Sequence, residues 1–473
     1  MLMEHCGIIA VLNKLARDVT HRIYEGLIAL QHRGQESAGI AILDGDKISL
    51  IKNLGFVTEA IKPSDLNKLK GYAGIGHVRY STTGESSLKE AQPMIYYISN
   101  KDELYFAIAF NGTISNYYLL KKRLVSLGYR FHTNTDTEVL AALVSYYWKL
   151  TQDFLEALKK TMSALKGAYS IVILTSNGEI YAMRDPLGFK PLVLGKSKDS
   201  IIIASESIAI DSLGGELIRD ISPGEILKIS DSGNLESYIV SNGNRRAYCM
   251  FEYIYFSRPD SVINGISVYD VRLKLGEILA KLYPVEADVI IPVPDTGVIA
   301  ALGYSRVSGI PISMGLIRNP YVGRTFIKPN QALRELSVQL KMGVVKEIVD
   351  GKKIVLIDDS IVRGTTIKWI IKLLRNAGAK EIHTRITCPP IKYPCYMGID
   401  FPMRRELIAS KHSVEEIRRL IGADSLGYMT IEGLIEAIGL SRNNLCLACL
   451  TGEYLIERAQ IPVLEEVFGG VKR

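Results

Sequence analysis

The fold of the second half of the chain is decided by residues 354–366, which have the sequence IVLIDDSIVRGTT. The first four residues are apolar, as expected for a strand buried on both faces of a parallel sheet. Two carboxylates follow, at the end of the strand where ligands bind in open α/β sheets. A helix is predicted after the loop, because Ile367, Ile370, Ile371 and Leu374 recur at the spacing of a core-facing helical stripe.

The loop that follows this strand has the chemistry of a site for a phosphorylated sugar. Its N–H groups, its hydroxyls and the helix N-terminus favour a phosphate, and Gly364 lets the backbone approach a ligand closely. Asp358 and Asp359 can accept hydrogen bonds from two sugar hydroxyls, directly or through water bound to Mg²⁺. An acidic turn that only caps a strand is the alternative. We favour the ligand site because the whole strand–loop–helix run fits it, and not only the acidic pair.

The two halves of the chain differ in the pattern of their apolar runs. The first half has short β-like runs, such as residues 39–43, divided by Gly, Asn, Asp and Ser. The second half alternates strand and helix, beginning with a strand at 289–293, and this alternation predicts βαβ units on a parallel sheet. The polar, glycine-containing stretch 241–245 is the predicted boundary. We therefore expect one domain over residues 6–240 and a second over residues 245–473.

Composition limits the class of protein. The chain has 473 residues, of which 47% are apolar and 23% charged, close to an ordinary globular protein. The net charge of +7 is small for this length, which indicates a modest preference for anions and argues against a nucleic-acid partner. The sequence has no run of about 20 apolar residues and no signal peptide, so we expect no membrane segment and a cytoplasmic location. Six cysteines are too few for a disulfide scaffold.

Residues 354–366 resemble the motif that binds 5-phosphoribosyl-1-pyrophosphate (PRPP) in type I phosphoribosyltransferases. Residues 291–297 again join a strand to a helix, at the position of that family's pyrophosphate loop. Residues 319–329 resemble the flexible loop that closes over PRPP and excludes water; a solvated basic loop is the alternative. The resemblance implies a Mg²⁺ ion at Thr296, Asp358 and Asp359. It implies that PRPP and its phosphates contact Asp295, Thr296, Gly297, Arg324, Lys328, Asp358, Asp359, Ser360, Arg363, Gly364, Thr365 and Thr366.

The first half has a cysteine near its start and four polar, glycine-rich or helix-opening loops. Cys6 begins the first predicted strand, where a lone cysteine is more often a small buried hydrophobic residue. The loops lie at residues 31–39, 76–84, 111–116 and 134–138. In this order they resemble class II glutamine amidotransferases, which are N-terminal-nucleophile (Ntn) hydrolases. The resemblance implies an αββα sandwich in this half, beside an α/β domain with a parallel sheet in the other.

The amidotransferase resemblance assigns a role to five residues. If residues 1–5 are a propeptide, their removal makes Cys6 the N-terminus, and its α-amine, with a pKa of about 7.7–8.0, can act as base for its own thiol. Arg79 would pair with the glutamine carboxylate, since its fork geometry suits a carboxylate. Asp136 would hold the glutamine ammonium, and Asn111 and the Gly112 N–H would form the oxyanion hole. Taken alone, Arg79 is more often in a surface ion pair and Asn111-Gly112 in a tight turn.

The other cysteines suggest a metal site in the second half. Cys446 and Cys449 form a C-x-x-C pair, a spacing shared by redox, zinc and iron–sulfur sites. One branch of the enzymes that join the two domains carries both a propeptide and a [4Fe–4S] cluster. Resemblance to that branch implies cluster ligands at Cys249, Cys395, Cys446 and Cys449, with Cys388 left as a buried thiol. A structural Zn²⁺ held by the same four cysteines is the alternative.

Together, in this order, the two halves resemble the glutamine-dependent amidotransferases that act on PRPP. The resemblance implies an enzyme that aminates PRPP to 5-phosphoribosylamine in purine biosynthesis, with glutamate and pyrophosphate released. It also implies feedback inhibition by purine nucleotides and a homo-oligomer, either a tetramer or a dimer. Two alternatives are another Ntn glutaminase that feeds a different acceptor and a PRPP-sensing regulator without catalysis.

Overall fold

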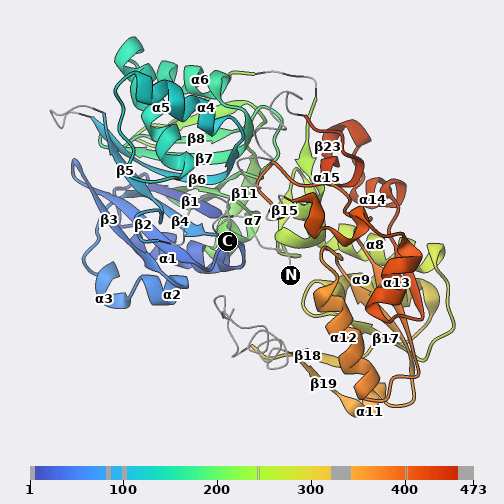
Figure 1. Cartoon of the computed structure of the whole chain (residues 1–473). Helices are drawn as coiled ribbons and strands as arrows, with labels where there is room; N and C mark the ends of the chain where they lie inside the picture. Colours follow the sequence, from blue (N-terminus) through green and yellow to red (C-terminus); the bar gives the residue numbers. More distant parts are fainter. Residues whose placement is uncertain are drawn as a thin grey trace.

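The computed structural model consists of two halves joined near the middle of the chain (Figure 1). In the part of the chain that the structure describes, no helix is long and apolar enough to cross a membrane. The described residues are 6–80, 87–98, 104–241, 243, 245–320, 342–399, 401 and 403–455.

The first half contains two antiparallel sheets. Their central strands, such as β1 and β8, are buried along their whole length because both faces of each sheet are covered. The first sheet has the order β11 (Glu216–Asp220), β9 (Val193–Ser197), β10 (Ser200–Ala204), β1 (Gly7–Asn13), β4 (Ala73–Arg79), β2 (Ser37–Asp44) and β3 (Lys47–Leu54). The second has the order β13 (Leu235–Ile239), β12 (Glu225–Ile229), β8 (Ile180–Arg184), β7 (Gly167–Thr175), β6 (Tyr105–Ile114) and β5 (Met94–Tyr97).

The two sheets pack face to face between two layers of helices. On β1, Ile8 and Ala10 belong to the apolar core between the sheets, whereas Ile9 and Val11 point to the helices on the outer face. Those outer helices are α1 (Thr20–Ala29), α2 (Val57–Ala60) and α7 (Ser207–Ser212), with α3 (Pro63–Leu66) close by in sequence. The second sheet is covered by α4 (Tyr117–Ser126), α5 (Asp136–Thr151) and α6 (Phe154–Ala164) (Figure 1). The predicted αββα sandwich is confirmed.

The second half is built on a four-stranded parallel sheet, which confirms the predicted α/β domain. Strand β20 (Lys353–Asp358) is buried over residues 354–358 and lies between two neighbours. The predicted stripe of four apolar residues forms the buried face of α12 (Thr365–Asn376). The sheet order is β17 (Val289–Pro292), β20, β21 (Glu381–Ile386) and β22 (Ser425–Tyr428). The other helices are α8 (Val268–Leu282), α9 (Gly297–Ser308), α11 (Lys346–Val349), α13 (Val414–Ile421) and α14 (Ile431–Ile438), and a small hairpin joins β18 (Leu316–Arg318) to β19 (Met342–Val344).

The last described part of the chain returns to the junction between the halves. Strand β14 (Tyr248–Cys249) pairs in parallel with β23 (Leu445–Cys446), and the short helix α15 (Ala448–Thr451) follows. A π-helical turn over Glu252–Phe256 leads from β14 into the second half, before the short hairpin of β15 (Val262–Ile263) and β16 (Ile266–Ser267). The chain therefore brings residues about 200 positions apart in sequence side by side at this junction.

Candidate functional site

Cys6 lies immediately before β1 and its side chain is half-buried. The Sγ atom donates a hydrogen bond to the carbonyl oxygen of Tyr80, 3.4 Å away. Burial raises the pKa of the thiol to about 11, with Arg79 lowering the pKa and Asp136 raising it. The thiol is therefore protonated near neutral pH, and a nucleophilic thiolate needs a nearby base.

Asn111 lies inside strand β6, where it pairs with Ser170 of β7. We expected a loop over residues 111–116, and this expectation was wrong for residues 111–114, because the sheet pairing continues to Ile114. The Asn111 side chain is fully buried, and neither its oxygen nor its nitrogen makes a hydrogen bond among the described residues. Burying an unpaired amide costs about 1–3 kcal/mol, so this side chain is suited to a ligand.

Gly112 follows Asn111 in β6 and has a backbone conformation that favours glycine, with φ of +149°. A Cβ atom at this position would lie 2.0 Å from the carbonyl oxygen of Ala168 on the neighbouring strand. Only glycine therefore permits β6 and β7 to approach here.

Arg79 and Asp136 complete this first site. Arg79 ends β4, is buried, and donates from Nη2 to Oε2 of Glu90 at 3.1 Å. Asp136 begins α5, and its Oδ2 accepts from the Ile114 N–H at 3.2 Å. Burial raises the Asp136 pKa to about 6, while backbone hydrogen bonds and the Arg79 charge oppose the rise. A cation and a carboxylate thus lie within electrostatic reach of the Cys6 thiol.

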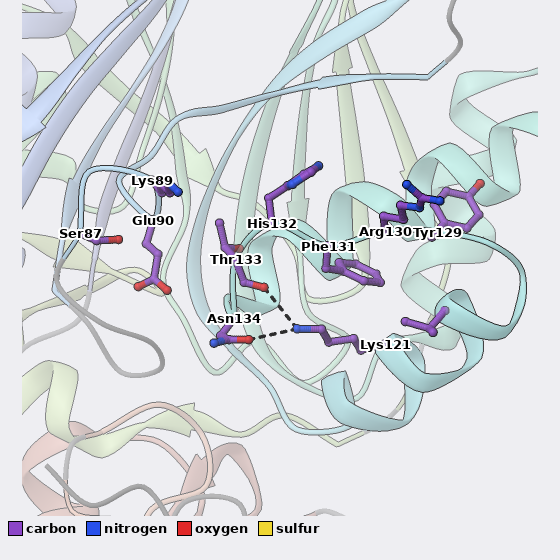
Figure 2. A pocket seen from close by; sticks show the side chains of 11 residues that line it. Ser87, Lys89, Glu90, Lys121, Tyr129, Arg130, Phe131, His132, Thr133 and Asn134 are labelled. Atoms are coloured by element: carbon purple, nitrogen blue, oxygen red, sulfur yellow. Dashed lines mark hydrogen bonds between the residues drawn. The ribbon is translucent and has the colours of Figure 1, made fainter.

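A surface cavity of about 600 Å³ opens beside Arg79's partner Glu90. In Figure 2, Ser87, Lys89 and Glu90 lie across the cavity from the segment that leads into α5. Lys121 donates to the carbonyl oxygen of Thr133 and to the side chain of Asn134 on that segment. The cavity thus lies between residues 87–90, which follow Arg79 in sequence, and residues 129–134, which precede Asp136.

A buried ionic network, which was not predicted from the sequence, contacts the backbone of Cys6. Arg33 is 1% exposed and donates from Nε to the backbone oxygen of Cys6 at 3.2 Å. Its two terminal nitrogens contact both oxygens of Glu252, at 2.9 and 3.0 Å, and Nη1 also donates to Glu206 at 2.5 Å. Glu252 belongs to the π-helical turn of the second half. Glu252 of the second half therefore fixes the position of Arg33, and Arg33 in turn binds the backbone oxygen of Cys6.

The second site lies at the end of β20, where Asp358 and Asp359 are both 7% exposed. The Asp359 N–H donates to Asp358 Oδ1 at 2.9 Å, and the hydroxyls of Thr296 and Ser360 donate to the Asp359 carboxylate. Burial raises the pKa of both carboxyls, and the neighbouring Asp359 raises that of Asp358 further. Hydrogen bonds from Ser360 and Thr296 and the charge of Arg272 oppose the rise at Asp359. This buried acidic pair is suited to a cation or to hydroxyl donors.

The two predicted phosphate loops lie against each other at the sheet edge. Gly297 begins α9, and a Cβ there would lie 2.5 Å from the carbonyl oxygen of Ile357. Gly364 precedes α12 with φ of +78°, in the left-handed region, and Thr365 and Thr366 form the first turn. The structure thus brings Thr296, Gly297 and the loop of residues 358–366 together.

Two of the predicted phosphate contacts, Arg363 and Asp295, are held in ion pairs within the protein. Arg363 donates from Nε to Glu406 at 3.0 Å, and Asp295 accepts from Arg318 at 2.6 Å. Arg324 and Lys328 lie outside the described residues, as does the predicted propeptide of residues 1–5.

The four predicted cluster cysteines line one small cavity at the junction. Cys249 and Cys446 are paired positions of β14 and β23, and Cys449 lies on α15. Cys395 approaches from a loop, where its Sγ accepts from the Met397 N–H at 3.3 Å. The cavity has a volume of about 20 Å³, enough for about one water molecule. Cys388 is buried elsewhere in the core of the second half.

Burial raises the pKa of all four of these thiols, and that of Cys446 reaches about 12. Among the described residues, no three or more Cys, His, Asp or Glu side chains are grouped closely enough to hold a single metal ion. All four cysteines line the same cavity. A tetrahedral Zn²⁺ site would need sulfurs about 3.8 Å apart, given Zn–S bonds of about 2.3 Å.

Comparisons with known proteins cover nearly the whole chain. A glutamine amidotransferase domain model matches residues 77–212, and a phosphoribosyl transferase domain model matches residues 264–394. The amidophosphoribosyltransferase of Methanocaldococcus jannaschii is 50% identical over 466 residues, which covers 96% of this chain and 98% of that protein. The Bacillus subtilis amidophosphoribosyltransferase is 46% identical, over 98% of this chain and 97% of that protein.

Solved structures agree with these relatives. The glutamine PRPP amidotransferase of Bacillus subtilis, solved with ADP and GMP, matches with a TM-score of 0.88 and 44% identity. The match covers 96% of this chain and 98% of that one. A second structure, described as the allosteric regulatory enzyme of purine biosynthesis, has a TM-score of 0.89 and 44% identity, and covers 96% of each chain. The fold, the two sites and these relatives lead to one conclusion: this chain belongs to the amidophosphoribosyltransferase family.

Proposed function

We propose that this protein transfers the amide nitrogen of glutamine to PRPP, and so forms 5-phosphoribosylamine, glutamate and pyrophosphate in purine biosynthesis. The observation that carries the proposal is the pairing of two sites in one chain. One is a half-buried cysteine beside a buried arginine and carboxylate; the other is a buried acidic pair at the edge of a parallel sheet. No observation on the described residues favours a different acceptor or a non-catalytic regulator.

Glutamine binding uses the charges of the first site. Arg79 already binds one carboxylate, that of Glu90, so its guanidinium is oriented for the α-carboxylate of glutamine. Asp136 supplies the opposite charge for the substrate ammonium. Since burial raises the Asp136 pKa to about 6, this carboxylate is ionised at neutral pH and titrates just below it.

Glutamine hydrolysis begins when the propeptide has been removed. The freed α-amine of Cys6 takes the thiol proton, and the thiolate attacks the amide carbon. Asn111 and the Gly112 N–H stabilise the oxyanion that forms on the former carbonyl oxygen. The C–N bond then breaks, ammonia leaves with the proton from the amine, and water hydrolyses the thioester to glutamate. Arg33 keeps the Cys6 backbone in place during these steps.

PRPP binding uses the second site. Asp358 and Asp359 accept hydrogen bonds from the ribose hydroxyls, and the loop of residues 360–366 binds the 5-phosphate. Thr296, Asp358 and Asp359 offer only oxygen atoms, the ligands that Mg²⁺ prefers, so we assign Mg²⁺ to them. Mg²⁺ supplies charge that stabilises the leaving pyrophosphate. Ammonia attacks C1 of the ribose, the C1–O bond breaks, and pyrophosphate leaves. We assign Arg324 and Lys328 to the pyrophosphate.

We assign a structural [4Fe–4S] cluster to Cys249, Cys395, Cys446 and Cys449. The donor set is four thiols around one cavity, without a carboxylate or an imidazole. A set of four cysteine thiolates is the usual ligand set of a [4Fe–4S] cluster. The cluster would tie β14, β23 and α15 together.

We also assign the binding of inhibitory nucleotides to the phosphate loop, residues 360–366. The Bacillus subtilis structure was solved with ADP and GMP, and we propose that purine nucleotides inhibit this protein by placing a phosphate on residues 360–366. A homo-oligomer, as a tetramer or a dimer, and a cytoplasmic location remain our predictions.

The proposed reaction is tested by replacing both acidic residues, Asp358→Ala together with Asp359→Ala. We expect loss of PRPP-dependent phosphoribosylamine formation, with part of the glutamine hydrolysis retained, because Cys6 lies in the other half. The measurement follows glutamate and pyrophosphate release separately. Unchanged pyrophosphate release in the double variant would contradict the site and the proposed reaction.

A further inference from the structure

Two lining residues of the cysteine cavity, Phe189 and Lys190, come from the first half of the molecule. Lys190 is 1% exposed and lines the same cavity as Cys249, Cys395, Cys446 and Cys449. Lysine is almost never fully buried unless an anion accompanies it. The four cysteines belong to the second half, so the Lys190 side chain reaches their cavity across the junction between the two halves.

The backbone around Lys190 is fixed against the strand that carries a proposed ligand. The Lys190 carbonyl oxygen accepts from Arg184 Nε at 2.8 Å. The carbonyl oxygen of Phe189 accepts from the Cys249 N–H at 3.4 Å, and that of Leu187 accepts from the Ala247 N–H at 2.7 Å. The turn that presents the ammonium is therefore paired with β14, and its position relative to the cysteines is set by backbone hydrogen bonds.

A cysteine-bound cluster at this place needs a positive charge. Four thiolates outweigh the positive charge of the metal–sulfide core, and a buried net negative charge is costly unless it is compensated. Arg33 and Glu252 also lie within electrostatic reach of Lys190, but they form an ion pair with each other. Groups that surround the ligands of a metal centre stabilise it and tune its potential.

We propose that Lys190 is a positioning residue for the [4Fe–4S] cluster: its ammonium compensates the charge of the cysteine ligands and so ties the cluster to the first half. This inference rests on the cluster assignment made above. With this contact the bound cluster has a second role. It connects the first half to the second, in addition to connecting β14, β23 and α15 within the second half.

The test compares Lys190→Met, Lys190→Arg and the natural protein, purified without oxygen. Lys228→Met is the matched control, since Lys228 is a partly buried lysine of the same half that pairs with Glu179 at 2.6 Å, away from the cavity. Three quantities are measured: iron and sulfide per chain, the rate of iron release to a chelator, and the midpoint potential of the cluster.

We expect Lys190→Met to lose iron at least about fivefold faster and to have a more negative midpoint potential, because reduction adds an electron without the nearby cation. Lys190→Arg should restore both quantities, and Lys228→Met should match the natural protein. Equal release rates and potentials in Lys190→Met and the natural protein would overturn the role of Lys190 while leaving the cluster in place. If Lys190→Met does not fold, Lys190→Gln takes its place in the comparison. Absence of iron and sulfide from the natural protein would overturn the cluster itself.

Discussion

The two sites differ in how the chain assembles them. The PRPP site is largely local, since Asp358, Asp359 and the loop to Thr366 follow one another in a strand–loop–helix unit. The glutamine site is assembled from Cys6, Arg79, Asn111 and Asp136, which come from the residue before β1, two further strands and one helix. It also depends on Arg33, which is held by Glu252 of the other half. A local site can persist when distant parts of the molecule change, whereas an assembled site is sensitive to the packing of the whole.

The strongest test of this comparison removes the nucleophile. In Cys6→Ala we expect glutamine-dependent synthesis to fall by more than about 10³-fold, as is usual when an activated nucleophile is lost. Synthesis from added ammonia should persist, because the acidic pair lies in the other half. Phosphoribosylamine formation is measured with glutamine and with an ammonium salt. Lys228→Met, which breaks the Lys228–Glu179 ion pair away from both sites, should retain both activities. Loss of the ammonia-dependent activity in Cys6→Ala would show that the two sites are not separable.

The next test replaces Asn111 by Leu, which has a similar size and no hydrogen-bond donor. Loss of an oxyanion donor should lower kcat for glutamine hydrolysis by about 10²–10³-fold. The melting temperature should not fall, because the natural amide is buried without a partner among the described residues. Kinetics and thermal unfolding are measured on the same preparation. A kcat within threefold of the natural value, or a clear drop in melting temperature, would assign Asn111 to structure instead.

The difference between the sites also explains what the sequence could predict. The β20–loop–α12 unit was predicted because strand, acidic pair, glycine and helical stripe are all local signals. The end of the strand before Asn111 was predicted wrongly: a polar residue followed by glycine is typical of a turn, but pairing with β7 carries β6 on to Ile114. Neither Glu252 nor Lys190 has a local signal, because a charged side chain is expected at the surface until its distant partner is known.

The dependence of the glutamine site on the second half is tested by Glu252→Gln. The substitution removes one of the two carboxylates that hold Arg33, so the free energy of unfolding should fall by about 3–5 kcal/mol, as for other broken buried pairs. Glutamine turnover should fall by about tenfold, because Arg33 no longer fixes the Cys6 carbonyl oxygen. Asp260→Asn is the control, since it removes a pair with Arg258 that is about half exposed and worth about 0–1 kcal/mol. Equal effects of the two substitutions would remove Glu252 from the glutamine site.

The smallest expected effect is a pH dependence confined to the glutamine site. Two groups of that site must be deprotonated, the Cys6 α-amine, with an ordinary pKa of about 7.7–8.0, and Asp136, whose pKa burial raises to about 6. As pH falls, kcat/KM for glutamine should first decline with a slope of one on a logarithmic scale. Below about pH 6 the slope should approach two, because Asp136 then takes up a proton and no longer pairs with the substrate ammonium.

Asp136→Asn separates these two ionisations. The variant should be weaker at every pH, since a neutral amide binds an ammonium less well than a carboxylate does, but its profile should keep a slope of one below pH 6. The part of the decline that belongs to Asp136 amounts to about tenfold between pH 7 and pH 5 for a group that titrates near 6. A slope of two in Asp136→Asn would place the second proton on another group of the assembled site, and Glu90, which pairs with Arg79, would then be the next carboxylate to replace.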